Sequence, residues 1–125
     1  MTKTGGGAIV NISSADGLIE RPDAADYNAS KHGVIGLTKS ASTEYRESRV
    51  RVNAVLPGLT VTPLIESLLD DPSFGPQVAN IAARHTIDRH GQPIDIAEAC
   101  RWLLSNHSSY INGVSLPVDG GYLAR

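Results

Sequence analysis

The feature that most constrains the fold is a long stretch without proline, residues 23–47, that lies between two apolar runs. The first run, residues 8–12, has the continuous apolar character of a strand buried on both faces. The second, residues 50–56, is rich in β-branched side chains and ends at Pro57 and Gly58. A strand, a long helix and a second strand form a βαβ unit, in which the strands are parallel and the crossover is right-handed. We therefore expect an α/β fold.

The long helix has a predicted start, end and buried face. Asp23 is the expected N-cap, with Asp26 three residues later in an arrangement similar to a capping box. The helix is expected to run to about Glu47 because no proline interrupts it. Side chains at helical spacing predict its buried stripe: Val34, Leu37, Ala41 and Tyr45.

The second half of the chain predicts shorter elements. Two short helices are expected near residues 64–69 and 78–82, within a long excursion at about 60–90 that could form a lid beside a site. A longer helix is expected over 94–105 and a third strand over 114–118. Pro117 cannot donate to a strand ladder, so it indicates the end or the edge of the sheet.

Composition excludes several functional classes. With 125 residues the chain is one domain or part of one. The net charge is −2 without a basic block, so neither a nucleic acid nor an anionic membrane is an expected partner. The single Cys100 excludes an internal disulfide, and the four histidines lack the spacing of metal ligands, so no metal site is expected. No stretch has the length of a transmembrane helix or the features of a signal peptide, and we expect a soluble, cytoplasmic protein.

Three residues around the start of the long helix could carry proton chemistry. Ser14 follows the first strand, and open α/β sheets place their chemistry at the carboxyl ends of strands. Tyr27 and Lys31 have i,i+4 spacing, which puts them on one face of a helix. An ammonium about 4 Å from a phenol oxygen stabilises the phenolate by roughly 4 kcal/mol, although desolvation opposes this effect. The pair could therefore act as a general acid or base, with Ser14 holding the reacting oxygen; a packed tyrosine beside a solvated lysine is the plain structural alternative.

Four segments, in this order, resemble the short-chain dehydrogenase/reductase family. They are residues 11–17 (NISSADG), Tyr27-x-x-x-Lys31, residues 52–58 (VNAVLPG) followed by Thr62, and residues 111–113 (ING) followed by 117–121 (PVDGG). The resemblance extends from about residue 6 to residue 121. It implies an oxidoreductase that transfers a hydride between NAD or NADP and a small alcohol or ketone substrate.

The resemblance also assigns roles to the three residues above. Tyr27 would exchange the proton with the substrate oxygen. Lys31 would favour the phenolate and contact the nicotinamide ribose, and Ser14 would orient the substrate.

A turn after the second strand is the remaining part of the implied cofactor site. Pro57 and Gly58 begin this turn, which in the family wraps the nicotinamide. The backbone near Thr60 would meet the carboxamide, and the hydroxyl of Thr62 would lie near the phosphate region of the cofactor.

The resemblance covers only part of the family's fold. Members are roughly twice this long, and the chain resembles their C-terminal half. Glycines 5–7 precede a strand, whereas the glycines of a dinucleotide fingerprint follow one. The expected architecture is the C-terminal half of a doubly wound, Rossmann-type parallel sheet, with about three strands and flanking helices. Residues 1–125 would form a partial NAD(P)-binding domain with a substrate loop at about 60–90, without the family's upstream catalytic asparagine.

Three functional hypotheses remain open from the sequence. The first is the catalytic half of an NAD(P)-dependent oxidoreductase, and the resemblance implies a homo-oligomer, dimer or tetramer, at full length. The second is a truncated, inactive fragment without the dinucleotide-binding half. The third is a non-catalytic module for oligomerisation. The sequence leaves the substrate, the choice between NAD and NADP, and the reaction direction open.

Overall fold

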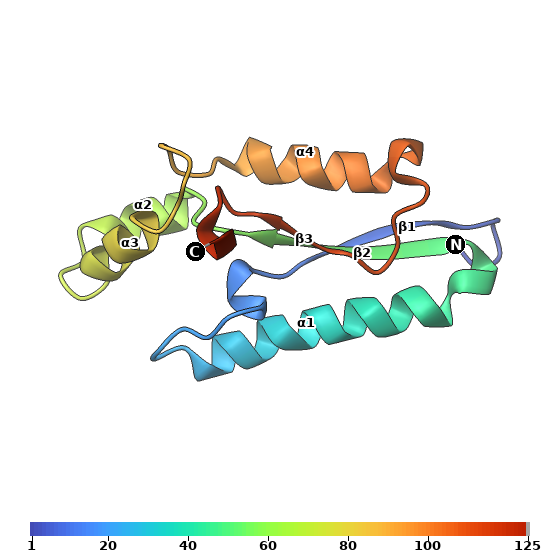
Figure 1. Cartoon of the computed structure of the whole chain (residues 1–125), viewed down its shortest axis with the longest axis horizontal. Coiled ribbons are helices and arrows are strands. Elements are labelled where there is room, and N and C mark those ends of the chain that lie inside the picture. Colours follow the sequence, from blue (N-terminus) through green and yellow to red (C-terminus); the bar gives the residue numbers. More distant parts are fainter. Residues whose placement is uncertain (125) are drawn as a thin grey trace.

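The computed structural model describes residues 1–124 and contains one parallel sheet of three strands (Figure 1). The strands are β1 (Gly7–Ile12), β2 (Val50–Pro57) and β3 (Ser115–Val118), in the spatial order β1-β2-β3. Both pairings are parallel, with Gly7 opposite Val50 and Pro57 opposite Val118. The expected α/β fold with a Rossmann-type parallel sheet is confirmed, and β3, with its proline, lies at an edge as predicted.

Two long helices cover the two faces of the sheet, and two short helices lie beyond its carboxyl end. Figure 1 shows α1 (Ala25–Glu44) and α4 (Pro93–Leu104) on opposite faces. The short helices α2 (Pro63–Leu69) and α3 (Gly75–Ala82) lie where the sequence predicted them, past the carboxyl end of β2. Among the helices of residues 1–124, none combines the length and the apolar character that crossing a bilayer requires.

The predicted ends of the long helix were wrong. α1 begins at Ala25, and its N-cap is Ala24, which makes no side-chain capping bond. Asp23 instead has a φ of 58°, a left-handed conformation that aspartate tolerates better than most residues, and it turns the chain into the helix. At the other end, α1 stops at Glu44 and a short 3-10 turn follows.

The predicted buried stripe of α1 was wrong at two of its four positions, while Val34 and Ala41 are half-buried. Leu37 is 63% exposed and Tyr45 39% exposed. The side chains buried against the sheet are instead Ile35, Thr38 and Ser42. Thr38 is fully buried, and its hydroxyl accepts a hydrogen bond from Asn11 on β1 at 2.9 Å. Because their hydroxyls are bonded, small polar residues can fill the interface that the hydrophobic pattern assigned to larger ones.

Burial concentrates on the central strand. Val55 and Leu56 of β2 are fully buried, and Leu56 packs with Ile35 of α1. β1 was expected to be buried on both faces, but Ile9 is 37% and Ile12 47% exposed. The reason is its place at the edge of the sheet, where the covering helices protect it less than β2.

Polar side chains of β2 fix the connection between α4 and β3. Asn53 is fully buried; its Nδ2 donates to the carbonyl of Ile111 at 3.1 Å and its Oδ1 accepts from the amide of Val114 at 3.0 Å. Arg51 donates to the carbonyls of Leu103 at 2.9 Å and Ser105 at 3.0 Å. These bonds anchor the last strand and therefore the turn that follows it at the carboxyl end of the sheet.

Candidate active site

A cavity of about 470 Å³ lies at the carboxyl ends of the strands. In a parallel sheet these ends meet at one edge, so Ser14 after β1, Pro57 at the end of β2 and Tyr122 after β3 all line it. α2 and α3 form the facing wall with the apolar side chains Leu64, Ile65, Leu68, Phe74, Val78 and Ile81. This is the location that the sheet topology predicts for a ligand site.

The hydroxyl of Ser14 is oriented by the backbone that follows it. Ser14 is buried, and its Oγ accepts a hydrogen bond from the amide of Asp16 at 3.1 Å. No hydrogen bond within residues 1–124 uses the Ser14 hydroxyl as a donor. Its hydrogen is therefore available to an oxygen in the cavity.

The neighbouring Ser13 has a different task. Its hydroxyl donates to the carbonyl of Lys31 at 2.8 Å, and this bond ties the end of β1 to the first turns of α1. Alternation along the strand sends the two adjacent serines to different partners. Both serines line the cavity, but the hydroxyl hydrogen of Ser13 is committed to the helix, whereas that of Ser14 is not committed within residues 1–124.

Tyr27 and Lys31 lie one turn apart at the start of α1, and both line the same cavity as Ser14. The ammonium of Lys31 is 5.4 Å from the centroid of the Tyr27 ring, and Tyr27 remains 38% exposed. In the described part of the chain no hydrogen bond joins the side chains of Ser14, Tyr27 and Lys31, and the space between them is open to a ligand.

The turn after β2 forms the next part of the cavity wall. Pro57, Gly58 and Thr60 line it. Thr60 forms an isolated parallel bridge with Gly91, in which the amide of Gly91 donates to the carbonyl of Leu59 at 3.1 Å. Within residues 1–124, the backbone N–H and C=O of Thr60 take part in no hydrogen bond, so both are available to a ligand.

Thr62, the fourth predicted residue of this turn, lies differently. It is not among the residues that line the cavity. Its Oγ1 accepts from the amide of Ile65 at 3.4 Å, and Thr62 is thereby the N-cap of α2.

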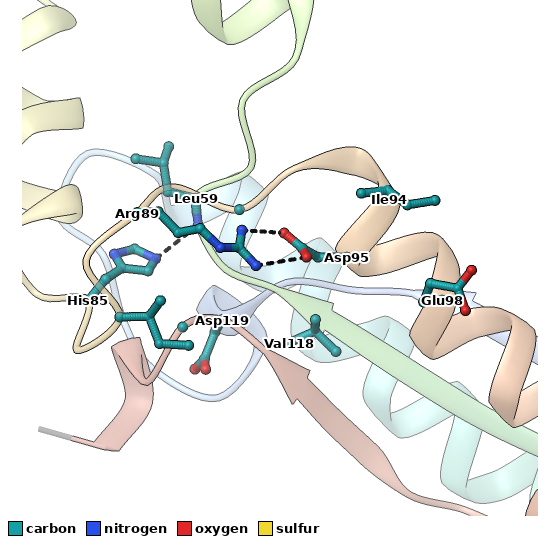
Figure 2. Close-up of a pocket in the computed structure, with 11 residues that line it drawn as sticks. Leu59, His85, Arg89, Ile94, Asp95, Glu98, Val118 and Asp119 are labelled. Atoms are coloured by element: carbon teal, nitrogen blue, oxygen red, sulfur yellow. Dashed lines mark hydrogen bonds and ion pairs between the residues drawn. The ribbon is translucent and has the colours of Figure 1, made fainter.

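A second, smaller pocket of about 320 Å³ lies behind the same turn (Figure 2). There Nε2 of His85 accepts a hydrogen bond from the amide of Leu59 at 3.3 Å, and its Nδ1 lies 2.9 Å from the carbonyl of Ile81. A neutral ring with its hydrogen on Nδ1 satisfies both contacts. His85 therefore links α3 to the turn that lines the cavity.

The sequence analysis assigned no role to two charged residues of the cavity wall. Arg21 and Asp16 both line the cavity, and Nε of Arg21 lies 2.9 Å from Oδ2 of Asp16. The guanidinium carbon of Arg21 is 5.5 Å from the centroid of the Tyr27 ring. The available signal was an arginine placed between the two catalytic candidates, Ser14 and Tyr27.

The arrangement suits proton transfer to or from an oxygen. Two cations lie within 6 Å of the centre of the phenol ring, a serine hydroxyl can donate into the same space, and apolar side chains form the opposite wall. Within residues 1–124, no group of three or more His, Cys, Asp or Glu side chains is placed to hold a metal ion.

Comparison with known proteins places this site in a wider context. A family model described as enoyl-(acyl carrier protein) reductase matches residues 1–123. Cis-4-hydroxycyclohexanecarboxylate dehydrogenase of Sinomonas cyclohexanicum is 44% identical over 124 residues, which are 99% of this chain and 48% of that protein. Cyclohexanol dehydrogenase of Acinetobacter sp. (strain SE19) is 41% identical over 121 residues, 97% of this chain and 45% of that protein. The chain thus spans about half the length of the curated relatives that it matches.

A solved structure has the same fold. The structure described as ElxO with NADP bound superposes with a TM-score of 0.88 at 37% identity, and the match covers all of this chain and 50% of that one.

Proposed function

The chain belongs to the short-chain dehydrogenase/reductase family, and from this premise we propose that it is the catalytic part of an NAD(P)-dependent oxidoreductase of alcohols and ketones. The named relatives are dehydrogenases, and the similar ElxO structure holds NADP, which supports the proposal. Residues 1–125 then form the C-terminal part of a Rossmann-type NAD(P)-binding domain, and residues 60–90 form its substrate loop.

The residues of the cavity suit the nicotinamide end of such a cofactor. The uncommitted backbone N–H and C=O of Thr60 match the donor and acceptor of a carboxamide. Pro57, Gly58 and Lys31 lie on the same wall, where Lys31 can reach a ribose hydroxyl. NAD or NADP, when bound, supplies or accepts the hydride. In this proposal the hydroxyl of Thr62, which caps α2, would lie near the cofactor's phosphates.

In this proposal Tyr27 is the residue that transfers the proton. Its hydroxyl gives a proton to the carbonyl oxygen in reduction and takes one from the alcohol in oxidation. The ammonium of Lys31 stabilises the phenolate that remains after proton donation, and Ser14 donates a hydrogen bond to the same substrate oxygen. The apolar wall from α2 and α3 reduces the access of water to this oxygen.

The relatives and the wall together support cyclic secondary alcohols as a substrate class. The two relatives named above are dehydrogenases of cyclohexanol and of a hydroxycyclohexanecarboxylate. A saturated ring buries its surface well against the aliphatic and aromatic side chains of α2 and α3.

The observation that carries the proposal is the meeting of Ser14, Tyr27 and Lys31 on one cavity. It is tested by Tyr27→Phe in the protein at its native length, with cyclohexanol as substrate and NAD or NADP as cofactor. Turnover should nearly vanish while cofactor binding, followed by fluorescence, is retained. Tyr45→Phe, at the far end of α1, is the matched control and should keep full activity. Substantial turnover by Tyr27→Phe would exclude the assigned role.

A second possibility is that the 125-residue chain by itself lacks a complete cofactor site. The support for it is their coverage of 48% of a relative. Titration of NADH and NADPH into the 125-residue chain separates the two cases, because tight binding is incompatible with an incomplete site.

We also propose a homo-oligomer at native length. Leu37 on α1 is 63% exposed and Leu104 on α4 is 51% exposed, and burial between copies would remove this apolar surface from water. Sedimentation velocity measures the oligomeric state, and a clean monomer would exclude the proposed homo-oligomer.

A further inference from the structure

The guanidinium group of Arg21 has donors without acceptors. Its Nε is buried, lies 2.9 Å from Oδ2 of Asp16, and still makes no directed hydrogen bond, so the contact is an ion pair. In the part of the chain that the structure describes, no hydrogen bond uses Nη1 or Nη2 of Arg21 either. A guanidinium offers five N–H donors in a rigid fork, and a buried donor without an acceptor is unfavourable. The Nη donors, which make no hydrogen bond within residues 1–124, can serve a ligand that accepts hydrogen bonds.

Arg21 is held where such a ligand would meet it. Its backbone carbonyl accepts a hydrogen bond from Nδ2 of Asn28 on α1 at 3.1 Å, which fixes the loop against the helix. Its side chain is 26% exposed and lines the same cavity as Tyr27. Because the group is already positioned, a ligand does not have to order it on binding.

The charges on the cavity wall favour an anion. The formal charges on this wall are those of Asp16, Arg21 and Lys31, which sum to one positive charge. The side chains contributed by α2 and α3 are apolar. A ligand with an apolar body and one carboxylate matches both parts of the wall.

We propose that Arg21 is a specificity-determining residue that binds the carboxylate of a small hydroxy acid or keto acid. This inference rests on the proposed function, since the hydroxyl or ketone of the same molecule is placed at Tyr27 and Ser14. The planar guanidinium can bind a carboxylate through two parallel hydrogen bonds, which a lysine cannot do. The guanidinium carbon is 5.5 Å from the Tyr27 ring, so one small ring or a short chain can reach from the carboxylate to the reacting oxygen.

Binding of two matched probes tests the inference without turnover. Calorimetry on the protein at its native length compares cyclohexanecarboxylate with its neutral amide, cyclohexanecarboxamide. The unaltered protein should bind the carboxylate tenfold or more tightly than the amide, as a charge-assisted hydrogen bond implies. Arg21→Gln should abolish this preference, and Arg21→Lys should keep only part of it. Arg46→Gln removes an exposed arginine elsewhere and should preserve the preference.

A second variant is expected to strengthen binding, so that a loss of binding in Arg21→Gln is not mistaken for a folding defect. Asp16→Asn removes the competing carboxylate from the wall and should tighten binding of cyclohexanecarboxylate. Equal binding of the two probes, no binding of either, or a preference that survives in Arg21→Gln would overturn the inference. Turnover of cyclohexanol without any carboxylate preference defeats this inference alone. A preference that depends on Arg21 in a protein without turnover defeats the proposed function alone.

Discussion

The carboxylate of Asp95 accepts two hydrogen bonds from the guanidinium of Arg89, at 2.6 Å from Nη1 to Oδ2 and 2.9 Å from Nη2 to Oδ1 (Figure 2). It also accepts the amide of Gln92 at 2.8 Å, which closes the first turn of α4. These bonds, with Arg89 as the largest cause and the Gln92 amide as the second, lower the pKa of Asp95 to about 2 from its usual 3.8. The pair joins α4 to the loop that returns from α3.

The first prediction concerns acid stability. Because the folded-state pKa of Asp95 is depressed, its contribution to the free energy of unfolding is complete above the ordinary pKa of 3.8 and is lost as the pH falls towards about 2. Asp95→Asn should therefore have a lower urea midpoint than the unaltered protein at pH 7, and the difference should shrink between pH 4 and pH 2. The effect should be small because the pair is exposed. Glu98→Gln, which breaks a pair within α4 only, is the control; a difference that grows on acidification would contradict the argument.

The second prediction separates the two adjacent serines. Under the proposed function, Ser14→Ala removes a hydrogen-bond donor to the reacting oxygen and should lower kcat by about 10²–10³. Ser13→Ala removes the bond to the carbonyl of Lys31 and should instead lower the free energy of unfolding by about 1 kcal/mol. Steady-state kinetics and urea unfolding of both variants provide the comparison. Equal losses of kcat would show that the two serines do not divide these tasks.

The third prediction concerns the buried amide of Asn53. Asn53→Ala leaves the amide of Val114 without its partner and the carbonyl of Ile111 with only the longer bond from Arg51 at 3.3 Å, and it should destabilise the fold by about 2–3 kcal/mol. Chemical denaturation measures this. Asn80→Ala, on the exposed face of α3, should change stability by less than about 0.5 kcal/mol. Similar midpoints for the two variants would refute the assigned role of Asn53.

The fourth prediction uses two glycines in opposite surroundings. A Cβ on Gly58 would lie 2.8 Å from Cα of Asp119, a backbone atom, and 2.9 Å from Nε2 of His85. Gly58→Ala should therefore displace the turn, cost about 1–3 kcal/mol and weaken NADPH binding at native length. Gly36→Ala meets nothing within 4 Å on α1 and should stabilise the fold by up to about 1 kcal/mol. Unfolding curves that rank the two variants in the reverse order would contradict the packing described for the turn.

The fifth prediction concerns the single cysteine. Burial raises the pKa of the Cys100 thiol, which leaves less of the reactive thiolate at neutral pH. Alkylation by iodoacetamide at pH 7 should be several-fold slower in the folded protein than in urea. Equal rates would mean that the thiol is as accessible and as acidic as in an unfolded chain.

The sequence predicted the elements of the fold better than their packing. The strands and helices were found because period, proline and β-branching act locally. The face of α1 was misjudged because hydrogen bonds satisfy its buried hydroxyls: that of Thr38 accepts from Asn11, far along the chain, and that of Ser42 donates to the carbonyl of Lys39. A hydrophobic pattern contains neither bond. Asp23 was misjudged because its left-handed backbone follows from how the loop enters the helix.

Some residues of the candidate site were predicted from the sequence and others were missed, again because only local patterns can be recognised. Ser14, Tyr27 and Lys31 have a spacing that can be recognised locally, and they meet on one cavity. Arg21 lies in a loop without a pattern, and only the folded path of residues 17–24 brings its side chain beside Tyr27. The position of Arg21 in the site therefore follows from the path of the loop and not from a sequence pattern.

The division between the sheet and the two short helices has an evolutionary consequence. Ser14, Tyr27 and Lys31 are carried by β1 and α1, which the hydroxyl of Ser13 holds together, whereas the apolar wall is carried by α2 and α3. Substitutions in α2 and α3 can therefore reshape the space for a substrate while the residues proposed to transfer the proton keep their places. Descendants of one ancestral gene could in this way diverge in the molecules they accept and share a single reaction chemistry.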